Sequence, residues 1–525
     1  MFQRGSTTGF VRGPVFLRAS IISVVLFYGA ATAFAQTTET SLHFSFDTGS
    51  GPPLECKIYE VSRQTKGPKD RPLVIIEGLD LSSRDFGDFG RSQFEDVLRS
   101  PALRGGPDLW ELFLDKGFDF YLVDFKSFDH RIEDLATLLR LALFQGPENI
   151  WSTRTSQSEP FVILGASIGG VIGRLALSQA DQGGVNHHTR LFGSLDSPHK
   201  GAIIPLDIQA FVYFWSAYGS GAAEQLEQLH WQSVKQTLIQ RQEGRFPPSF
   251  PTTDFDDFQA LYQSTVPHNT RLIALSNGSA TGEEQLPDNY GRVQFDFDFD
   301  PTGPGDFDST LKSFNRFDGD VKYSKNHYGV FLSDETICMT ANRPNIENAP
   351  GGYRTSYATI RDSLKEAFDD SCEDGIPDWC GGVPTPVICQ DGRHCFVPLA
   401  SALDLNVDIK TREGVFAVPT ATVTSRFDAL YTAITNTVHP DITAYYGPLL
   451  YEIGVEHSQT IFVDNTYTGE ELGTPSNPFK TIAKANNFAW NGVEINIRAG
   501  SYPETVTFSK RMTVVSNGGP VIIGR

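Results

Sequence analysis

The pentapeptide Gly165-Ala166-Ser167-Ile168-Gly169 could hold a nucleophilic serine on a sharp turn. An apolar run precedes it, and the helix-like run VIGRLALSQA follows it. A G-x-S-x-G pattern between a strand and a helix is the sequence form of a nucleophile elbow, where a Cβ on either glycine would clash with neighbouring backbone. The pattern therefore nominates Ser167 as a nucleophile. The alternative is an ordinary strand–turn–helix corner.

A serine hydroxyl is a weak nucleophile at neutral pH, so Ser167 would need a histidine to take its proton and an acid to orient that histidine. Among the eleven histidines, His439 is the candidate base. It follows the apolar segment FDALYTA, expected to be the last strand, and begins an amphipathic pattern. The alternative is a structural histidine with satisfied hydrogen bonds. His199 lies too early in the chain to be the base, because the base is expected after the last strand. It is expected to shape the wall of the cleft that holds Ser167.

Alternating strand and helix patterns from about Ser41 to Gly454 would position these residues. The continuous apolar runs PLVIIEG (72–78) and DFYLVDF (119–125) are typical of strands buried on both faces of a parallel sheet. The helical pattern IEDLATLLRLALFQ follows the second run. Repetition of this order predicts an α/β fold with a doubly wound, mostly parallel sheet.

Two insertions interrupt the predicted sheet. Residues from about 205 to 266 form a helical, aromatic-rich stretch that is expected to be a lid over an apolar pocket, or else a helical pair packed on the core. Residues from about 280 to 390 are rich in Asp, Phe, Gly and Pro and are expected to form a long surface loop.

The chain resembles the lipase and esterase branch of the α/β-hydrolase superfamily. The segments GASIGG (165–170), LDSPHKGA (195–202) and FVPLASAL (396–403) carry the resemblance. The second is similar to the tPHxG loop of bacterial lipases. The resemblance implies hydrolysis of carboxylic esters of small molecules or lipids by a Ser-His-acid triad, in the chain order Ser, acid, His, with no metal or organic cofactor.

The same resemblance nominates Asp391 as the triad acid. The segment beginning Asp391-Gly392 is similar to the D-G-x-V-P-x-x-S segment that carries the acid in many lipases, although His394 stands where its aspartate is expected. Asp391 is the nearest carboxylate, and a bridge between Cys389 and Cys395 could curl the loop to present it. Two alternatives remain open: Asp404 and, after it, Asp320.

Two main-chain N–H groups are the candidate oxyanion hole. One belongs to Ile168, the residue after the nucleophile. The other belongs to Leu79, because Glu77-Gly78-Leu79 stands where related enzymes have His-Gly-x after the strand. Glu77 stands in the place of the usual histidine, and a donor that belongs to the main chain does not depend on that side chain. Asp80 is its neighbour.

The N-terminus predicts export. Three arginines precede an apolar run that ends in Ala33-Phe34-Ala35, so residues 1–35 are expected to be a signal peptide and residues 36–455 the hydrolase domain. The mature protein is then secreted, periplasmic or on the cell surface, with no later transmembrane segment. Six cysteines fit that compartment and suggest disulfides. The net charge of −20 argues against nucleic acid and anionic membranes as partners.

The character of the sequence changes at residues 456–525. Short β runs separated by Gly, Asn and Ser predict stacked coils of a β-solenoid. The segments NPFKTI (477–482) and AGSYPE (499–504) are similar to the opening of exported right-handed parallel β-helix modules of the pectin-lyase type. Residues 456–525 are too few for a free-standing solenoid, so an incomplete module is expected. Such a module suggests a surface glycan as a partner.

Two other functions use the same sequence features. In one, the hydrolase domain is a non-catalytic scaffold of a surface adhesion or glycan-binding protein. In the other, the triad serves a peptidase or an acyltransferase, because these activities share the elbow, the base and the oxyanion hole.

Overall fold

The computed structural model describes most of the segment from Thr37 to Gly524. The described residues are 37–49, 53–63, 71–79, 91–103, 106–154, 156–217, 220–244, 249–285, 293–299, 307–313, 322–328, 335–339, 346–360, 392–455, 460–469, 471, 473–490, 492–508 and 510–524. The expected signal peptide (1–35), Asp80, Asp320 and Asp391 lie outside them.

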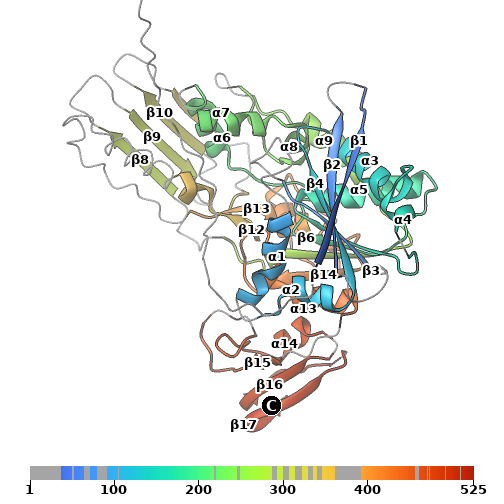
Figure 1. Cartoon of the computed structure of the whole chain (residues 1–525). Helices are drawn as coiled ribbons and strands as arrows, with labels where there is room; N and C mark the ends of the chain where they lie inside the picture. Colours follow the sequence, from blue (N-terminus) through green and yellow to red (C-terminus); the bar gives the residue numbers. More distant parts are fainter. Residues whose placement is uncertain are drawn as a thin grey trace, which may run out of the picture.

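One eight-stranded sheet forms the centre of the molecule, in the order β1-β2-β4-β3-β5-β6-β7-β14 (Figure 1). Its first two strands run antiparallel, and every pair from β4 to β14 is parallel. This arrangement confirms the expected doubly wound, mostly parallel sheet. The strands are β1 (Thr37–Phe46), β2 (Leu54–Arg63), β3 (Arg71–Ile76), β4 (Phe118–Phe125), β5 (Phe161–Ala166), β6 (Thr189–Leu195), β7 (Arg271–Ser279) and β14 (Ala429–Ala433).

Both faces of this sheet are covered, as its continuous apolar strands require. In β3, Val74 and Ile76 belong to the core on one face, whereas Leu73 and Ile75 belong to the core on the other. The first core contains α3 (Ile132–Arg140), η2 (Leu141–Gln145) and α5 (Ile168–Gln182), with α4 (Ile150–Thr153) beginning in it. The second contains α1 (Arg91–Leu103), α2 (Leu109–Asp115) and α13 (Tyr446–Ile453), preceded by η3 (Ile442–Ala444).

The first insertion is helical, as its sequence predicts. It forms α6 (Leu206–Trp215), α7 (Ser220–Leu229), α8 (Gln232–Thr237) and α9 (Thr253–Gln263). Residues of α8 and α9 belong to the same core as α5, so at least these two helices pack on the domain body. The helix α6 contacts β9 (Phe307–Ser313) and β10 (Lys322–Tyr328).

The second insertion contains a sheet where a surface loop was expected. Its described residues form a four-stranded antiparallel sheet in the order β11-β10-β9-β8, with β8 at Val293–Phe299 and β11 at Glu335–Met339. The physical reason lies in the sequence VQFDFDF, where aromatic and acidic residues alternate with the period of a strand. Further along, β12 (Gly351–Arg354) pairs with β13 (His394–Pro398), which α11 (Leu399–Ala402) and α12 (Arg412–Val415) follow.

The C-terminal segment forms a small parallel sheet at the bottom of Figure 1. Its order is β15-β16-β17, and one helix accompanies it; the described residues do not show the stacked coils of the expected solenoid. The elements are β15 (Thr460–Val463), α14 (Ile482–Phe488), β16 (Glu494–Tyr502) and β17 (Thr513–Ile523).

This C-terminal segment shares a core with the central sheet. The Tyr446 ring in α13 lies 4.8 Å from the Phe488 ring and 5.8 Å from the Trp490 ring, centroid to centroid. Trp490 is completely buried, and its cluster continues through α13 to strands β3, β5 and β6. The segment is therefore joined to the domain of the central sheet by apolar packing.

We expect Trp490→Ala to lower the stability of the whole chain. Truncating a buried Trp removes about 3–5 kcal/mol through lost burial and the cavity left behind. Thermal unfolding, followed by circular dichroism, should show a lower Tm for the main transition. Phe508→Ala in the same segment is the matched control, because Phe508 is 39% exposed and its truncation should change stability by about 0.5 kcal/mol or less. A main transition unchanged in Trp490→Ala would contradict shared stability.

Candidate active site

Ser167 stands on the turn between β5 and α5. Its backbone has φ 51° and ψ −128°, a conformation that non-glycine residues rarely adopt. The flanking glycines are required by close backbone contacts: a Cβ on Gly165 would lie 2.5 Å from the Gly170 Cα, and one on Gly169 would lie 2.0 Å from the Glu77 carbonyl oxygen. The turn therefore has the strained geometry that the sequence pattern predicts.

His439 lies between β14 and α13, as expected, and its imidazole reaches Ser167. The His439 Nε2 atom is 2.9 Å from the Ser167 Oγ atom. The main-chain N–H of His439 donates to the Tyr353 carbonyl at 2.9 Å, so the loop is fixed against β12. The imidazole is completely enclosed by protein.

Asp196 holds the other side of this imidazole. Its Oδ2 atom is 2.7 Å from the His439 Nδ1 atom. The Oδ1 atom accepts the main-chain N–H of Asn277 at 2.9 Å and the Ser276 hydroxyl at 3.3 Å. Asp196 directly follows β6, and both of its oxygens are thus engaged in a fully buried position. The three side chains Ser167, His439 and Asp196 form one hydrogen-bonded chain.

Asp196 replaces the carboxylates that the sequence suggested as partners of His439. Asp391 and Asp320 lie outside the described residues. Asp404 is described, but its carboxylate is 2.8 Å from the Arg174 guanidinium and 3.2 Å from the Arg426 guanidinium. It therefore serves a buried ion pair behind α5, away from the imidazole.

A signal for Asp196 was present in the sequence. The carboxyl ends of adjacent parallel strands meet at one edge of a sheet, and that edge is where open α/β folds place their sites. Asp196 is the first residue after TRLFGSL (189–195), the next strand-like run along the chain after the serine elbow. The resemblance of residues 391–403 to a lipase segment favours Asp391 instead.

The pKa of His439 is lowered, chiefly because burial disfavours the charged imidazolium. The hydrogen bond and charge of Asp196 oppose this effect, and the nearby Arg354 adds to it. His439 is therefore neutral at neutral pH. Because Nδ1 faces a carboxylate, Nδ1 carries the proton, and the unprotonated Nε2 can accept one from Ser167.

His199 has a structural environment and lies in the core. Its Nε2 and Nδ1 atoms are each 2.6 Å from a hydroxyl, those of Ser194 and Tyr262 respectively. Burial lowers the pKa of His199 to about 3, so the ring stays neutral. It is completely buried, and the expected place in a cleft wall is wrong.

The expected oxyanion-hole segment lies beside the serine. A Cβ on Gly78 would be 3.1 Å from the Ser167 Cβ, so the chain after β3 passes directly over the nucleophile. Leu79 is the last described residue of this segment and is half-buried. Ile168 begins α5, whose N-terminal end carries partial positive charge toward Ser167. Ile168 therefore stands next to the serine along the chain, and Gly78, the residue before Leu79, lies close to it in space.

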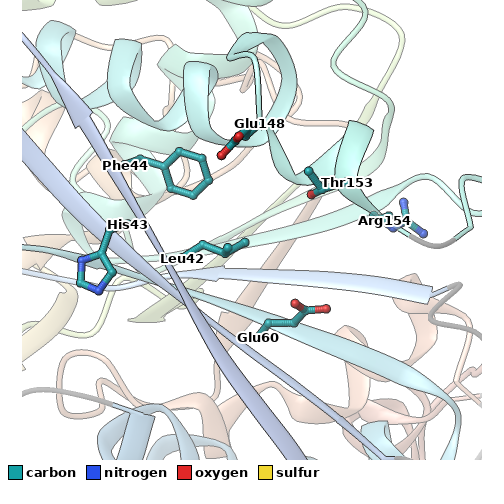
Figure 2. Close-up of a pocket in the computed structure, with 7 residues that line it drawn as sticks. All are labelled: Leu42, His43, Phe44, Glu60, Glu148, Thr153 and Arg154. Atoms are coloured by element: carbon teal, nitrogen blue, oxygen red, sulfur yellow. The ribbon is translucent and has the colours of Figure 1, made fainter.

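No group of three or more metal-ligating side chains occurs among the described residues. A pocket of about 220 Å³ is present, but none of its lining residues belongs to the Ser167 site. Figure 2 shows it between β1, β2 and the α4 region, at the opposite edge of the sheet from β14. It is lined by Leu42, His43, Phe44, Glu60, Glu148, Thr153 and Arg154.

The described cysteine side chains carry no disulfide. Cys56 and Cys395 are free and buried, so the suggested bridge between Cys389 and Cys395 is not observed; Cys389 lies outside the described residues. Cys395 is packed between strands, where a Cβ on Gly351 would be 2.8 Å from its sulfur. Over the described part of the chain, the helices are all too short or too polar to cross a membrane.

Comparison with known proteins gives distant structural likenesses. No family model matches the chain, and no curated protein matches it. Among solved structures, it is similar to a hyperthermophilic esterase from the archaeon Pyrobaculum calidifontis at 13% identity and a TM-score of 0.25, covering 45% of this chain and 64% of the esterase. A bacterial heroin esterase gives 17% identity and a TM-score of 0.26, and the match covers 47% of this chain and 68% of the esterase. A peroxisomal α/β-hydrolase from Saccharomyces cerevisiae gives 11% identity and a TM-score of 0.26, and the match covers 46% of this chain and 74% of the hydrolase.

The ion pair of Asp404 predicts a loss of stability in Asp404→Asn. Removing one partner of a buried pair costs about 3–5 kcal/mol, because the other charge stays buried and uncompensated. Burial alone would raise the pKa of Asp404, but Arg174 and neighbouring cations hold it below its usual value. The stabilisation is thus present above the unfolded pKa and is lost as pH falls through the lowered folded pKa.

Urea unfolding at pH 7 and pH 3 measures this effect. The difference between wild type and Asp404→Asn should be large at pH 7 and smaller at pH 3. Glu413→Gln, at an exposed position, is the control and should match wild type. Equal stability of Asp404→Asn and wild type at pH 7 would show that the pair is not stabilising relative to an amide.

Proposed function

We propose that the protein is a serine hydrolase that cleaves carboxylic esters. The observation that carries the proposal is the hydrogen-bonded chain from the Ser167 hydroxyl through His439 to Asp196, on a strained strand-to-helix turn. A neutral histidine held by a carboxylate on one side and a serine hydroxyl on the other is the arrangement that nucleophilic acyl transfer needs. Asp196 takes the role of triad acid that the sequence analysis predicts for Asp391.

The reaction follows from these positions. The Ser167 Oγ attacks the ester carbonyl while its proton passes to the His439 Nε2 atom. Asp196 stabilises the imidazolium so formed and keeps its own negative charge. The imidazolium then protonates the leaving alkoxide, which departs as the alcohol and leaves an acyl-serine. Water, deprotonated by the same imidazole, attacks the acyl-serine, releases the carboxylic acid and restores the Ser167 hydroxyl.

The tetrahedral intermediates carry a negative oxygen that needs donors. We assign this role to the main-chain N–H groups of Ile168 and Leu79. The close approach of the Gly78 segment to Ser167 supports the assignment, because even a Cβ on Gly78 would lie only 3.1 Å from the Ser167 Cβ. Removing one such donor from a hydrolase typically costs about 100- to 1,000-fold in kcat.

The remaining features of the proposal concern substrate and location. Within the helical insertion, α6 and α7 would act as a lid, and the aromatic residues of α6 favour an apolar acyl group. The N-terminal sequence favours export to the cell surface, the periplasm or the medium. A peptidase or acyltransferase would use the same three residues, so amide substrates and acyl acceptors belong in the same assay.

We expect Ser167→Ala, His439→Ala and Asp196→Asn each to lose hydrolysis of 4-nitrophenyl esters with acyl chains from C2 to C16. Removal of the serine or histidine should bring kcat to background, and Asp196→Asn should lower it about 10⁴-fold because an amide favours the wrong imidazole tautomer. Asp408→Asn, at an exposed position, should remain fully active. A fluorophosphonate probe should label wild type and not Ser167→Ala.

Two results would contradict this proposal. Full activity in Asp196→Asn would remove Asp196 from the triad while leaving the serine and histidine in place. Absence of both hydrolysis and probe labelling in wild type would show that the Ser167 arrangement is not a hydrolytic site.

The pH dependence of kcat/KM should follow the lowered pKa of His439. Only the neutral imidazole can accept the serine proton, so activity should rise as pH increases through the His439 pKa and stay level above it. Because that pKa lies below 6.5, the half-maximal point should lie below pH 6.5. Initial rates with a neutral ester from pH 4 to pH 8 measure it. A midpoint above 6.5 would mean that the bond to Asp196 outweighs burial.

A further inference from the structure

Arg354 is a charged residue beside the candidate site that no step of the proposed hydrolysis uses. It ends β12, the strand that forms one wall of this site. A Cβ on Gly352 would lie 2.0 Å from the Asp196 Oδ2 atom, and the Tyr353 carbonyl accepts the His439 main-chain N–H at 2.9 Å. The strand that carries Arg354 therefore contacts both the acid and the base.

The guanidinium of Arg354 shares an aromatic neighbour with the imidazole of His439. The Arg354 Cζ atom is 5.5 Å from the centroid of the Phe396 ring. The same Phe396 ring lies 4.9 Å from the His439 ring, centroid to centroid. Arg354 is exposed, whereas His439 is buried. The Phe396 ring thus lies between the Arg354 guanidinium, which is on the solvent side, and the His439 imidazole.

The charge of Arg354 is not matched by a carboxylate within the described part of the chain, where no ion pair or hydrogen bond joins its guanidinium to another side chain. Asp196 acts on it electrostatically, but that carboxylate is already bonded to His439. The buried Arg174, in contrast, is paired with Asp404. Desolvation lowers the pKa of Arg354 although its surface is exposed. The guanidinium of Arg354 is thus partly desolvated by the surrounding protein, while the residue stays exposed to solvent.

We infer that Arg354 binds an anionic group of the substrate, so that the site prefers esters that carry a carboxylate a few bonds from the scissile carbonyl. This inference rests on the proposed ester hydrolysis and names its substrate class. A guanidinium binds a carboxylate through two parallel hydrogen bonds and is the side chain best suited to that task. The net charge of −20 repels anions over the rest of the surface, so a preference for them needs a local cation.

The preference should be expressed mainly in KM. Arg354 would hold a group that does not react, and its bond to that group would have similar strength in the ground state and the transition state. Loss of such a bond raises KM and leaves kcat nearly unchanged. A residue that only tuned the His439 pKa would instead shift the pH profile equally for neutral and anionic esters.

The experiment compares matched neutral and anionic esters in the full chain. On the acyl side the pair is 4-nitrophenyl pentanoate and mono-4-nitrophenyl glutarate; on the alcohol side it is phenyl acetate and 4-acetoxybenzoate. The variants are Arg354→Gln, Arg354→Lys and Arg412→Gln. Arg412 is the control because its guanidinium also lies over an aromatic ring, with Cζ 4.1 Å from the centroid of Phe416, and its loss changes the net charge equally. Unlike Arg354, it already has a carboxylate partner among the described residues, Glu284 at 3.5 Å.

Wild type should hydrolyse one anionic ester with a higher kcat/KM than its neutral partner. The pair that shows this identifies the side of the ester on which the carboxylate lies. Arg354→Gln should lower kcat/KM for the anionic ester about 10- to 100-fold, mainly through KM, and change the neutral ester less than about twofold. Arg354→Lys should retain part of the preference, and Arg412→Gln should behave as wild type.

Several outcomes would overturn the role of Arg354. One is hydrolysis of neutral esters, with probe labelling of Ser167, but without preference for either anionic ester. Another is an equal loss on neutral and anionic esters in Arg354→Gln, or a loss of the preference in Arg412→Gln. In these cases the proposed hydrolase activity stands. Absence of hydrolysis and of probe labelling would remove both proposals together.

Discussion

The site depends on one constraint, the meeting of four strand ends at one edge of the central sheet. Ser167 follows β5, Asp196 follows β6, and His439 follows β14. The strand between the last two, β7, supplies the main-chain N–H of Asn277 that fixes the carboxylate of Asp196. Because all these strands are parallel neighbours, residues far apart in the chain lie within hydrogen-bond distance. A change in strand order would separate them.

Two buried aspartates illustrate how the surroundings assign different tasks to one residue type. Asp196 faces an imidazole and main-chain and hydroxyl donors, so its charge is available to a histidine that gains a proton. Asp404 faces the guanidiniums of Arg174 and Arg426, so its charge is neutralised permanently. Both are almost fully buried. Their partners, rather than their burial, distinguish a residue suited to proton transfer from one suited to holding elements together.

The part of the chain that interrupts the sheet also builds the site. The strand β12 comes from the stretch between β7 and β14, yet it lies against Asp196 and fixes the His439 loop through Tyr353. Its partner strand β13 contributes the Phe396 ring that separates Arg354 from His439. This stretch of chain thus supplies β12, which forms a wall of the site, and the charge of Arg354, on which the inferred substrate class depends.

Local chemistry made some of these features readable from the sequence. Continuous apolar runs determined the buried strands, and the glycines around Ser167 determined the elbow, because both depend on neighbours in the chain. His439 was readable because it follows the last strand. The sequence places Asp196 after a strand, but its partnership with His439 depends on the spatial order of β6, β7 and β14, which periodicity does not contain. The cation Arg354 and its place beside Phe396 likewise required the pairing of β12 with β13, a contact between distant segments that only the tertiary structure decides.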